Sequence, residues 1–216
     1  SSKVIEKKFD NFSAKLVIDN GQVINSDLVV ASDGYPSSSA KEAKIKYFDN
    51  NYNQSSIVGI FKHKIPHDSE AIQIFLPSGP LAILPLPGNR SSFVWTMKNN
   101  DVNRIFNLSD LLFLKELNTA LQNRRGKIEF ESKRNMFPIS LAFSKSLVKE
   151  KFVIIGDTAH KIHPIAGQGL NLGIRDVAAL AEVLILSRRL GEDIGSCLVL
   201  DKYSKWRSWD ILSLVF

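Results

Sequence analysis

A strand–loop–helix pattern in the last third of the chain limits its fold more than any other feature. The apolar run "FVII" (152–155) ends at a Gly-Asp pair (156–157). Such a run is typical of a strand buried on both faces, as in a parallel sheet. A Gly-Gln-Gly turn (167–169) then opens a long, mostly apolar stretch. This stretch predicts a helix that is buried over most of its circumference.

The rest of the chain predicts a hairpin and a set of short strands. Asn20-Gly21 separates two alternating segments, which is a strong hairpin signal. A further apolar run then ends at Asp33-Gly34, and a turn with a short helix is expected after it. Residues 55–98 predict four short strands bounded by Pro, Gly or Asn. Their close spacing favours antiparallel pairing, because parallel strands need long crossovers.

One helix and one more strand are expected between these strands and the last third. Residues 108–126 predict the helix, with Ser109 as its N-cap and Gly126 as its stop. Residues 127–139 predict the strand.

The composition is that of an ordinary globular protein. The 216 residues are 44% hydrophobic and 23% charged, and no apolar run reaches the ~18 residues of a membrane-spanning helix. The start, "SSKVIEKK", has no apolar core of a signal peptide. The single cysteine, Cys197, rules out an intrachain disulfide. The net charge of +6 comes from scattered lysines and arginines, which favours a solvated basic face over nucleic-acid binding.

The loop between the last strand and its helix is a candidate ligand site. A helix N-terminus presents free N–H groups and a partial positive charge. Gly167 and Gly169 would let a planar ligand approach the backbone without a Cβ clash. Asp157 follows the strand at the end where open α/β sheets place their ligands. Each residue alone is better explained by a turn or a helix cap, and only the combination favours a ligand.

A metal site is the alternative for the same loop. Asp157, His160 and His163 recur every third residue, and both residue types are common metal ligands. However, Pro164 and the glycines favour a loop, and no other His or Cys cluster completes a ligand shell. No metal site is therefore predicted.

"GDTAHKIHPIAGQGLNLGIRD" (156–176) resembles the second flavin-binding motif of the FAD-dependent aromatic hydroxylases. That motif reads G-D-x-A-H, then a proline, then G-Q-G, with an Asn and a later Asp. The matching positions are Gly156, Asp157, Ala159, His160, Pro164, Gly167, Gln168, Gly169, Asn171 and Asp176.

"DLVVASDGYPSS" (27–38) resembles the Asp-Gly motif of the same family. Asp33, Gly34 and Ser37 match that motif, whereas Ala40 stands where the family has Arg. Within the family, the segments 75–96 and 200–207 are most similar to the ubiquinone-biosynthesis hydroxylases.

The resemblance implies the fold class α/β (α+β): a partial Rossmann-like FAD-binding domain combined with an antiparallel-rich substrate-domain sheet. The FAD-binding domain would comprise residues 1–45 and 141–216, and the substrate domain residues 46–140. The family opens with a strand, G-x-G-x-x-G and a helix, and this glycine triplet does not occur in the 216 residues. The sequence is therefore expected to be an internal or truncated piece that exposes apolar surface where parallel neighbours are lacking.

The resemblance also implies the cofactors and the reaction. FAD would be reduced by NAD(P)H and react with O2 to hydroxylate an aromatic ring of a polyprenylated ubiquinone precursor. No acid–base catalytic residue is implied. The implied cofactor-binding residues are Asp33, Gly34, Gly156, Asp157, Pro164, Gly167, Gln168, Gly169, Leu170 and Asn171.

Two other functions stay open at this point. The chain could be a non-catalytic fragment or split subunit that cannot bind FAD alone, or a related flavin hydroxylase or prenyl reductase. The expected partners are an aromatic polyprenyl substrate and a complementary chain or a second copy, with no nucleic acid. The expected location is cytoplasmic, with peripheral contact with the inner membrane.

Overall fold

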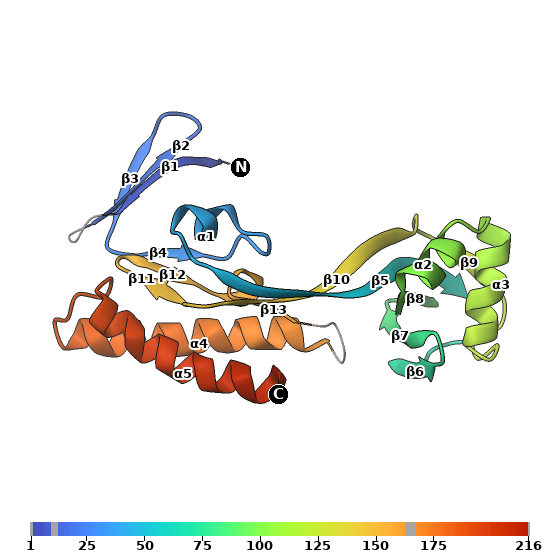
Figure 1. Cartoon of the computed structure of the whole chain (residues 1–216). Coiled ribbons are helices and arrows are strands. Elements are labelled where there is room, and N and C mark those ends of the chain that lie inside the picture. Colours follow the sequence, from blue (N-terminus) through green and yellow to red (C-terminus); the bar gives the residue numbers. More distant parts are fainter. Residues whose placement is uncertain (1, 10–12, 163–166, 216) are drawn as a thin grey trace. The chain divides into compact units, whose positions relative to one another are not determined.

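The computed structural model describes residues 2–9, 13–162 and 167–215, which divide into two compact units (Figure 1). One unit contains residues 1–50 and 141–216, and the other contains residues 51–140. Each unit has its own hydrophobic core. Two strands, β5 (Tyr47–His63) and β10 (Asn135–Ser144), continue from one unit into the other.

The unit of residues 51–140 is an antiparallel sheet with two helices. Its sheet has the order β5-β8-β7-β6, and β9 also pairs with β5. The antiparallel pairing expected for residues 55–98 is confirmed. The other elements of this unit are β6 (Ile72–Leu76), β7 (Gly79–Leu86), β8 (Arg90–Lys98), α2 (Asn99–Phe106), α3 (Asp110–Ala120) and β9 (Ile128–Phe130).

Three details of this unit differ from the sequence prediction. Helix α3 begins after the predicted N-cap Ser109 but ends at Ala120, well before Gly126. Its end is set by Gln122 and Asn123, which both adopt positive φ and so leave the helical conformation. Helix α2 was not predicted, and residues 127–139 form β9 and the first part of β10 rather than one strand.

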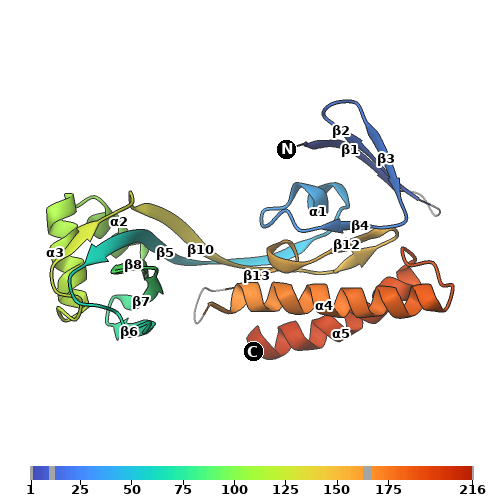
Figure 2. The ribbon, with the colours of Figure 1, turned by 180° about the vertical axis from the view of Figure 1, so that it is seen from behind.

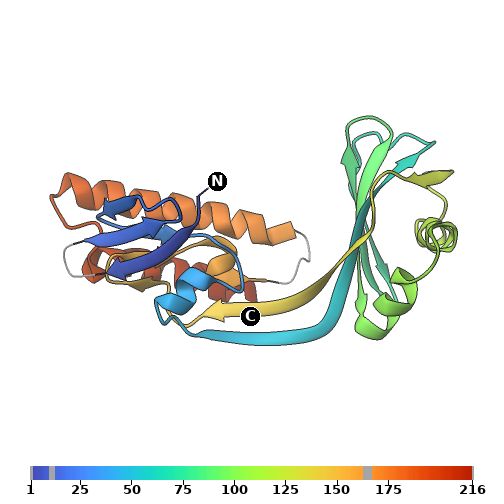
Figure 3. The ribbon, with the colours of Figure 1, turned by 90° about the horizontal axis from the view of Figure 1, so that it is seen from above.

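The other unit contains two three-stranded sheets. The first is a meander of β1 (Val4–Phe9), β2 (Ala14–Ile18) and β3 (Val23–Ser26), seen from above in Figure 3. It includes the predicted hairpin at Asn20-Gly21, where Gly21 has a φ of 84°. The second sheet has the order β11-β12-β4. Its strands are β4 (Val29–Ala31), β11 (Val148–Lys149) and β12 (Phe152–Ile154).

The predicted parallel pairing is found between β12 and β4, with Val153 opposite Val30. All three residues of β12 are buried. The remaining elements of the unit are α1 (Ser38–Glu42), the 3₁₀ turn η1 (Gly156–Thr158), β13 (His160–Lys161), α4 (Gln168–Arg189) and α5 (Cys197–Val215). Helices α4 and α5 lie side by side in both views (Figures 1 and 2).

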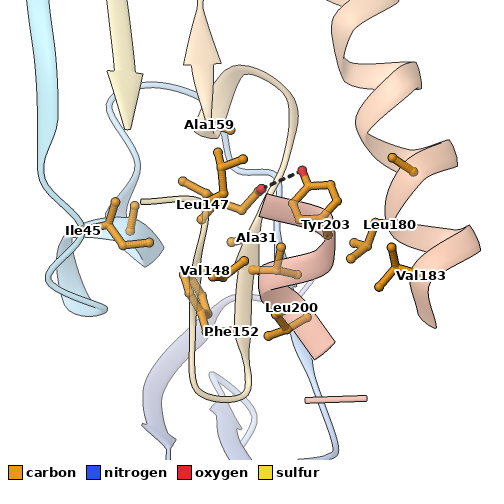
Figure 4. Packing of buried hydrophobic residues seen from close by; sticks show 14 of the residues in the cluster. Ala31, Ile45, Leu147, Val148, Phe152, Ala159, Leu180, Val183, Leu200 and Tyr203 are labelled. Carbon is orange, nitrogen blue, oxygen red and sulfur yellow. Dashed lines mark hydrogen bonds between the residues drawn. The ribbon is translucent and has the colours of Figure 1, made fainter. Parts of the chain in front are cut away.

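The prediction that the helix after the Gly-Gln-Gly turn, α4, is buried over most of its circumference is wrong. One stripe of α4 packs in the core, where Leu180 and Val183 lie near Leu200 and Tyr203 (Figure 4). Elsewhere α4 exposes large apolar side chains, among them Leu170 at 75% and Ile174 at 57%. Sequence periodicity shows which residues of a helix are apolar, whereas their burial depends on the elements that pack against the helix. The other described elements bury only one face of α4. No helix in the described ranges combines the length and apolar character needed to cross a membrane.

Candidate functional site

The two motif loops lie together at one end of the parallel strand pair. Strand β4 leads into Asp33-Gly34, and β12 leads into the turn η1. Because Ala31 lies opposite Ile154 in a parallel register, both loops follow the carboxyl ends of neighbouring strands. Open α/β sheets bind their ligands at the carboxyl ends of their strands.

Thr158 connects the two loops directly. Its hydroxyl accepts a hydrogen bond from the backbone N–H of Gly34 at 2.8 Å. The hydroxyl proton can be donated to Asp33 Oδ1, at 3.2 Å, or to the carbonyl of Gly34, at 3.3 Å. The carbonyl of Thr158 accepts a 2.6 Å hydrogen bond from the Tyr47 hydroxyl. The side chain is completely buried, so these contacts replace water and fix the spacing of the loops.

The carboxylate of Asp33 holds its own loop in shape. Oδ1 accepts a hydrogen bond from the Ser37 hydroxyl at 2.6 Å, and Oδ2 accepts one from the backbone N–H of Ser39 at 3.1 Å. Partial burial alone would raise the pKa of Asp33. The hydrogen bonds from Ser37 and Ser39 outweigh burial and lower the pKa to about 2. Asp33 is therefore a carboxylate that presents the backbone of Gly34 in a fixed position.

Asp157 and the start of α4 form the open part of the site. Asp157 is exposed, and a Cβ built on Gly169 would lie 3.9 Å from its Oδ1. The N-cap Gly167 is left-handed, with a φ of 63°, and makes no side-chain capping hydrogen bond. A carboxylate acceptor thus lies beside helix N–H donors and a partial positive charge. Gln168, Gly169, Leu170 and Asn171 form the first turn of this helix.

A buried charge cluster fixes the turn η1 against the two long helices. Asp176 Oδ2 accepts hydrogen bonds from the backbone N–H of Gly156 at 2.8 Å and from His160 Nε2 at 2.6 Å. Asp176 Oδ1 accepts one from Arg207 Nε at 2.6 Å. Asp176 and His160 are completely buried, and Arg207 is 2% exposed. The Tyr203 hydroxyl adds a 3.3 Å hydrogen bond to the carbonyl of Ile154 (Figure 4).

Opposing effects act on the ionisation of this cluster. Burial alone would raise the pKa of Asp176, but hydrogen bonding and charge attraction from His160 and hydrogen bonds from Gly156 and Arg207 lower it. Burial alone would lower the pKa of Arg207, but its hydrogen bonds to the carboxylates of Asp176 and Asp210 raise it. Both groups are therefore held in their charged forms.

The structure brings together the predicted residues Asp33, Gly34, Gly156, Asp157 and the first turn of α4. Pro164 and His163 lie outside the described residues. The other two histidines, His63 and His67, belong to no predicted site and lie in the other unit, where His63 contacts Ser91 and His67 contacts the carbonyl of Leu86. Among the residues that the structure describes, no group of three His, Cys, Asp or Glu side chains is arranged to hold a metal.

Sequence reasoning missed the linking role of Thr158 and the contact between Asp176 and Arg207. Thr158 stands at the position that the flavin motif leaves open, so no pattern singled it out. Asp176 and Arg207 each matched a family pattern, but the two are 31 residues apart and nothing in the sequence indicated that they touch.

Comparisons with known proteins agree with the motifs. The model of the family described as FAD binding domain matches residues 3–209. Ubiquinone hydroxylase UbiL of Rhodospirillum rubrum is 37% identical over 211 residues, covering 98% of this chain and 49% of that protein. Ubiquinone biosynthesis monooxygenase COQ6 of Schizosaccharomyces pombe is 32% identical, covering 85% of this chain and 47% of that protein. The chain spans about half the length of the curated relatives it matches.

A solved structure shares the fold. The pqsL protein of Pseudomonas aeruginosa, a probable FAD-dependent monooxygenase, has a TM-score of 0.76. The similarity covers 96% of this chain and 58% of that chain, at 20% sequence identity. The expected α/β (α+β) class with an antiparallel-rich sheet is thereby confirmed.

Replacing Thr158 with Val should destabilise the unit that contains it. The change keeps the shape of the side chain but leaves the N–H of Gly34 without its acceptor, which costs about 1–3 kcal/mol. Thr158→Ser, which keeps the hydroxyl, should cost less. Urea unfolding followed by circular dichroism measures both, and equal unfolding free energies for the two variants would contradict the linking role of the hydroxyl.

Asp33 should make the stability depend on pH in the acid range. The pKa of Asp33 is lowered from 3.8 to about 2 on folding. Its stabilisation is therefore fully present above pH 3.8 and is lost as the pH falls through about 2. Asp33→Asn should flatten this part of the profile of unfolding free energy against pH. Parallel profiles of unfolding free energy for the wild type and the variant between pH 4 and 2 would show that folding does not stabilise the ionised carboxylate of Asp33.

Replacing Asp176 with Asn should be strongly destabilising, by about 3–5 kcal/mol, because it removes the completely buried counter-charge of Arg207 and leaves only the partly exposed Asp210. Asp210→Asn is a matched control, because Asp210 also pairs with Arg207 but its side chain is 29% exposed. Thermal and urea unfolding would measure both variants. A loss for Asp176→Asn no larger than that for Asp210→Asn would contradict the central role of Asp176.

Proposed function

Because the chain belongs to the FAD binding domain family, we propose that its two motif loops hold the cofactor of a flavin-dependent hydroxylase. The reaction would be hydroxylation of an aromatic ring of a polyprenylated ubiquinone precursor, with NAD(P)H as the electron donor and O2 as the oxidant. The names of two relatives, a ubiquinone hydroxylase and a ubiquinone biosynthesis monooxygenase, support this substrate class.

One observation carries the proposal. The Asp33-Gly34 loop, the Gly156-Asp157 turn and the N-terminus of α4 lie together at the carboxyl end of a parallel strand pair. Two loops that are 124 residues apart in sequence are connected there by a buried hydroxyl. Two loops that served only as turns would not need to lie side by side. A cofactor that contacts both motifs requires them to be close together.

The residues present fit the groups that FAD carries. The N–H groups at the start of α4 would hold an electron-rich, carbonyl-bearing edge, and the exposed Asp157 carboxylate would accept hydrogen bonds from hydroxyl groups. Gly169 leaves free the space that a Cβ would occupy beside Asp157. When bound, FAD would supply the redox chemistry between NAD(P)H and O2.

The protein's own contribution would be binding and electrostatics. The partial positive charge of the α4 N-terminus favours negative charge in a ligand placed against it. Asp176 holds the backbone N–H of Gly156, and Thr158 holds that of Gly34, so neither loop is free to shift. No side chain is proposed as a catalytic acid or base.

The substrate side of the proposal concerns the antiparallel unit and the membrane. We assign binding of the aromatic substrate to the domain predicted at residues 46–140. A polyprenyl chain partitions into lipid, so the proposal includes peripheral contact with the inner membrane. The net charge of +6 is favourable for contact with anionic lipid.

A second candidate function has its own support. The chain spans about half the length of its relatives, and α4 exposes apolar side chains along its length. Both observations favour a flavoprotein portion that does not retain FAD by itself and is inactive until another segment completes it.

FAD retention tests the proposal and separates the two candidates. Purified protein is mixed with FAD and desalted, and its visible absorbance is recorded; a fluorescence titration then gives the dissociation constant. Retained flavin absorbance is expected if the described site is sufficient. Asp157→Ala should weaken binding by about 10- to 100-fold, because it removes a hydrogen bond to a charged group.

Asp201→Ala is the matched control, since Asp201 is also exposed but lies on α5. It should bind FAD as the wild type does. Equal binding by Asp157→Ala and wild type would contradict the placement of the ligand beside Asp157. A wild-type protein that retains no flavin would instead support the second candidate.

A further inference from the structure

The connection between β5 and β6, residues 64–71, contains a turn that needs outside contacts to keep its shape. The N–H of Glu70 donates to the carbonyl of His67 at 2.8 Å and closes the turn. Asp68 and Ser69 inside it are left-handed, with φ of 50° and 61°. Residues other than glycine occupy this region only where their surroundings hold them there. The contacts that hold this turn therefore decide whether the connection stays in place.

The imidazole of His67 makes these contacts. Its Nδ1 accepts a hydrogen bond from the backbone N–H of Ser69 at 2.9 Å. Its Nε2 lies 2.9 Å from the carbonyl oxygen of Leu86 and 2.9 Å from that of Gly88. A carbonyl oxygen only accepts, so Nε2 carries the ring proton and Nδ1 is the unprotonated nitrogen. The neutral ring thus joins the turn to the end of β7 and to the hairpin that follows it.

A protonated imidazole cannot make the same set of hydrogen bonds. Both ring nitrogens of a protonated histidine are donors, so Nδ1 would no longer accept from the N–H of Ser69. His67 is half-buried, so protons from solvent reach its ring. Histidine is the side chain that changes its charge between pH 5 and 8. A modest fall in pH is therefore able to break this contact.

The groups around His67 also disfavour a positive charge on its ring. The ring of His63 on β5 packs against it, with centroids 5.5 Å apart. Arg125 is 4% exposed, and its Nη1 donates to the carbonyl of Pro66, the residue before His67, at 3.3 Å. The carboxylate near this guanidinium, that of Glu70, is 3.5 Å from its Nη2 and is 60% exposed. The other charged side chains of these segments are exposed or paired with each other: Lys64, Asp68, Arg124, the pair Arg90–Glu131 and the pair Lys127–Glu129.

We propose that His67 is a proton-sensitive latch that holds the connection between β5 and β6 against the hairpin after β7. In the neutral form, the ring fixes the turn at residues 67–70. When Nδ1 takes up a proton, the hydrogen bond from Ser69 is lost and the turn is released. The released form binds the proton and the closed form excludes it, so a lower pH favours release. All of these residues belong to the unit of residues 51–140, and the inference does not depend on FAD binding.

NMR of the full chain between about pH 7.5 and about pH 5, where histidine titrates, tests the proposal. The ¹⁵N shifts of the His67 ring should show a proton on Nε2 and none on Nδ1 at the upper pH. Hydrogen exchange gives the protection of the Ser69 amide, after correction for the effect of pH on the intrinsic rate. This protection should fall at least about tenfold at the lower pH, while amides of the central strand β8, such as Val94, stay protected.

Two variants identify the group that takes up the proton. His67→Asn keeps an acceptor for the N–H of Ser69, because an Asn side chain accepts from the backbone two residues on, but it does not titrate. The protection of the Ser69 amide should then be the same at both pH values. His63→Asn is the matched control, since it removes the neighbouring imidazole and keeps His67. It should lose protection at Ser69 as the wild type does.

Each of four results would overturn the proposal. The first is a proton on Nδ1 of His67 at the upper pH. The second is wild-type protection at Ser69 that does not change with pH. The third is an equal loss of protection in His67→Asn, or its absence in His63→Asn, which would assign the titration to another group. The fourth is a parallel loss of protection at Val94, which would show unfolding of the whole unit instead of a local release.

Discussion

The arrangement of the site depends on one buried carboxylate. Asp176 lies on α4, and its two oxygens accept hydrogen bonds from the turn η1, from His160 and from α5. A buried charge without partners is strongly unfavourable, so these three contacts are required together. They place the strand β12, its turn and both long helices in one rigid arrangement. Thr158 extends that arrangement to the loop after β4.

Much of the fold could be predicted because it is encoded locally. The Asn20-Gly21 turn and the apolar run of β12 are short-range signals, and both appear as expected. The site was predictable only as two separate motifs. Their connection through Thr158 and the pairing of Asp176 with Arg207 join residues far apart in sequence. Such long-range contacts form only when the chain folds, and no periodic pattern in the sequence indicates them.

Helix α4 shows why apolar periodicity and burial are different quantities. Its sequence is apolar around most of the circumference, and that composition suits a helix with neighbours on several sides. The described residues provide the sheet and α5, which cover one stripe. The other apolar side chains of α4, among them Leu170 and Ile174, are exposed.

Hydrogen exchange at the start of α4, measured by NMR with and without FAD, tests the central claim most directly. The amides of Gln168, Gly169 and Leu170 precede the first hydrogen bond within α4, and Gly167 has no side chain that could cap them. The account predicts that FAD slows exchange at these amides. Exchange that FAD leaves unchanged at the α4 N-terminus, or slows only within residues 51–140, would contradict the proposed cofactor site.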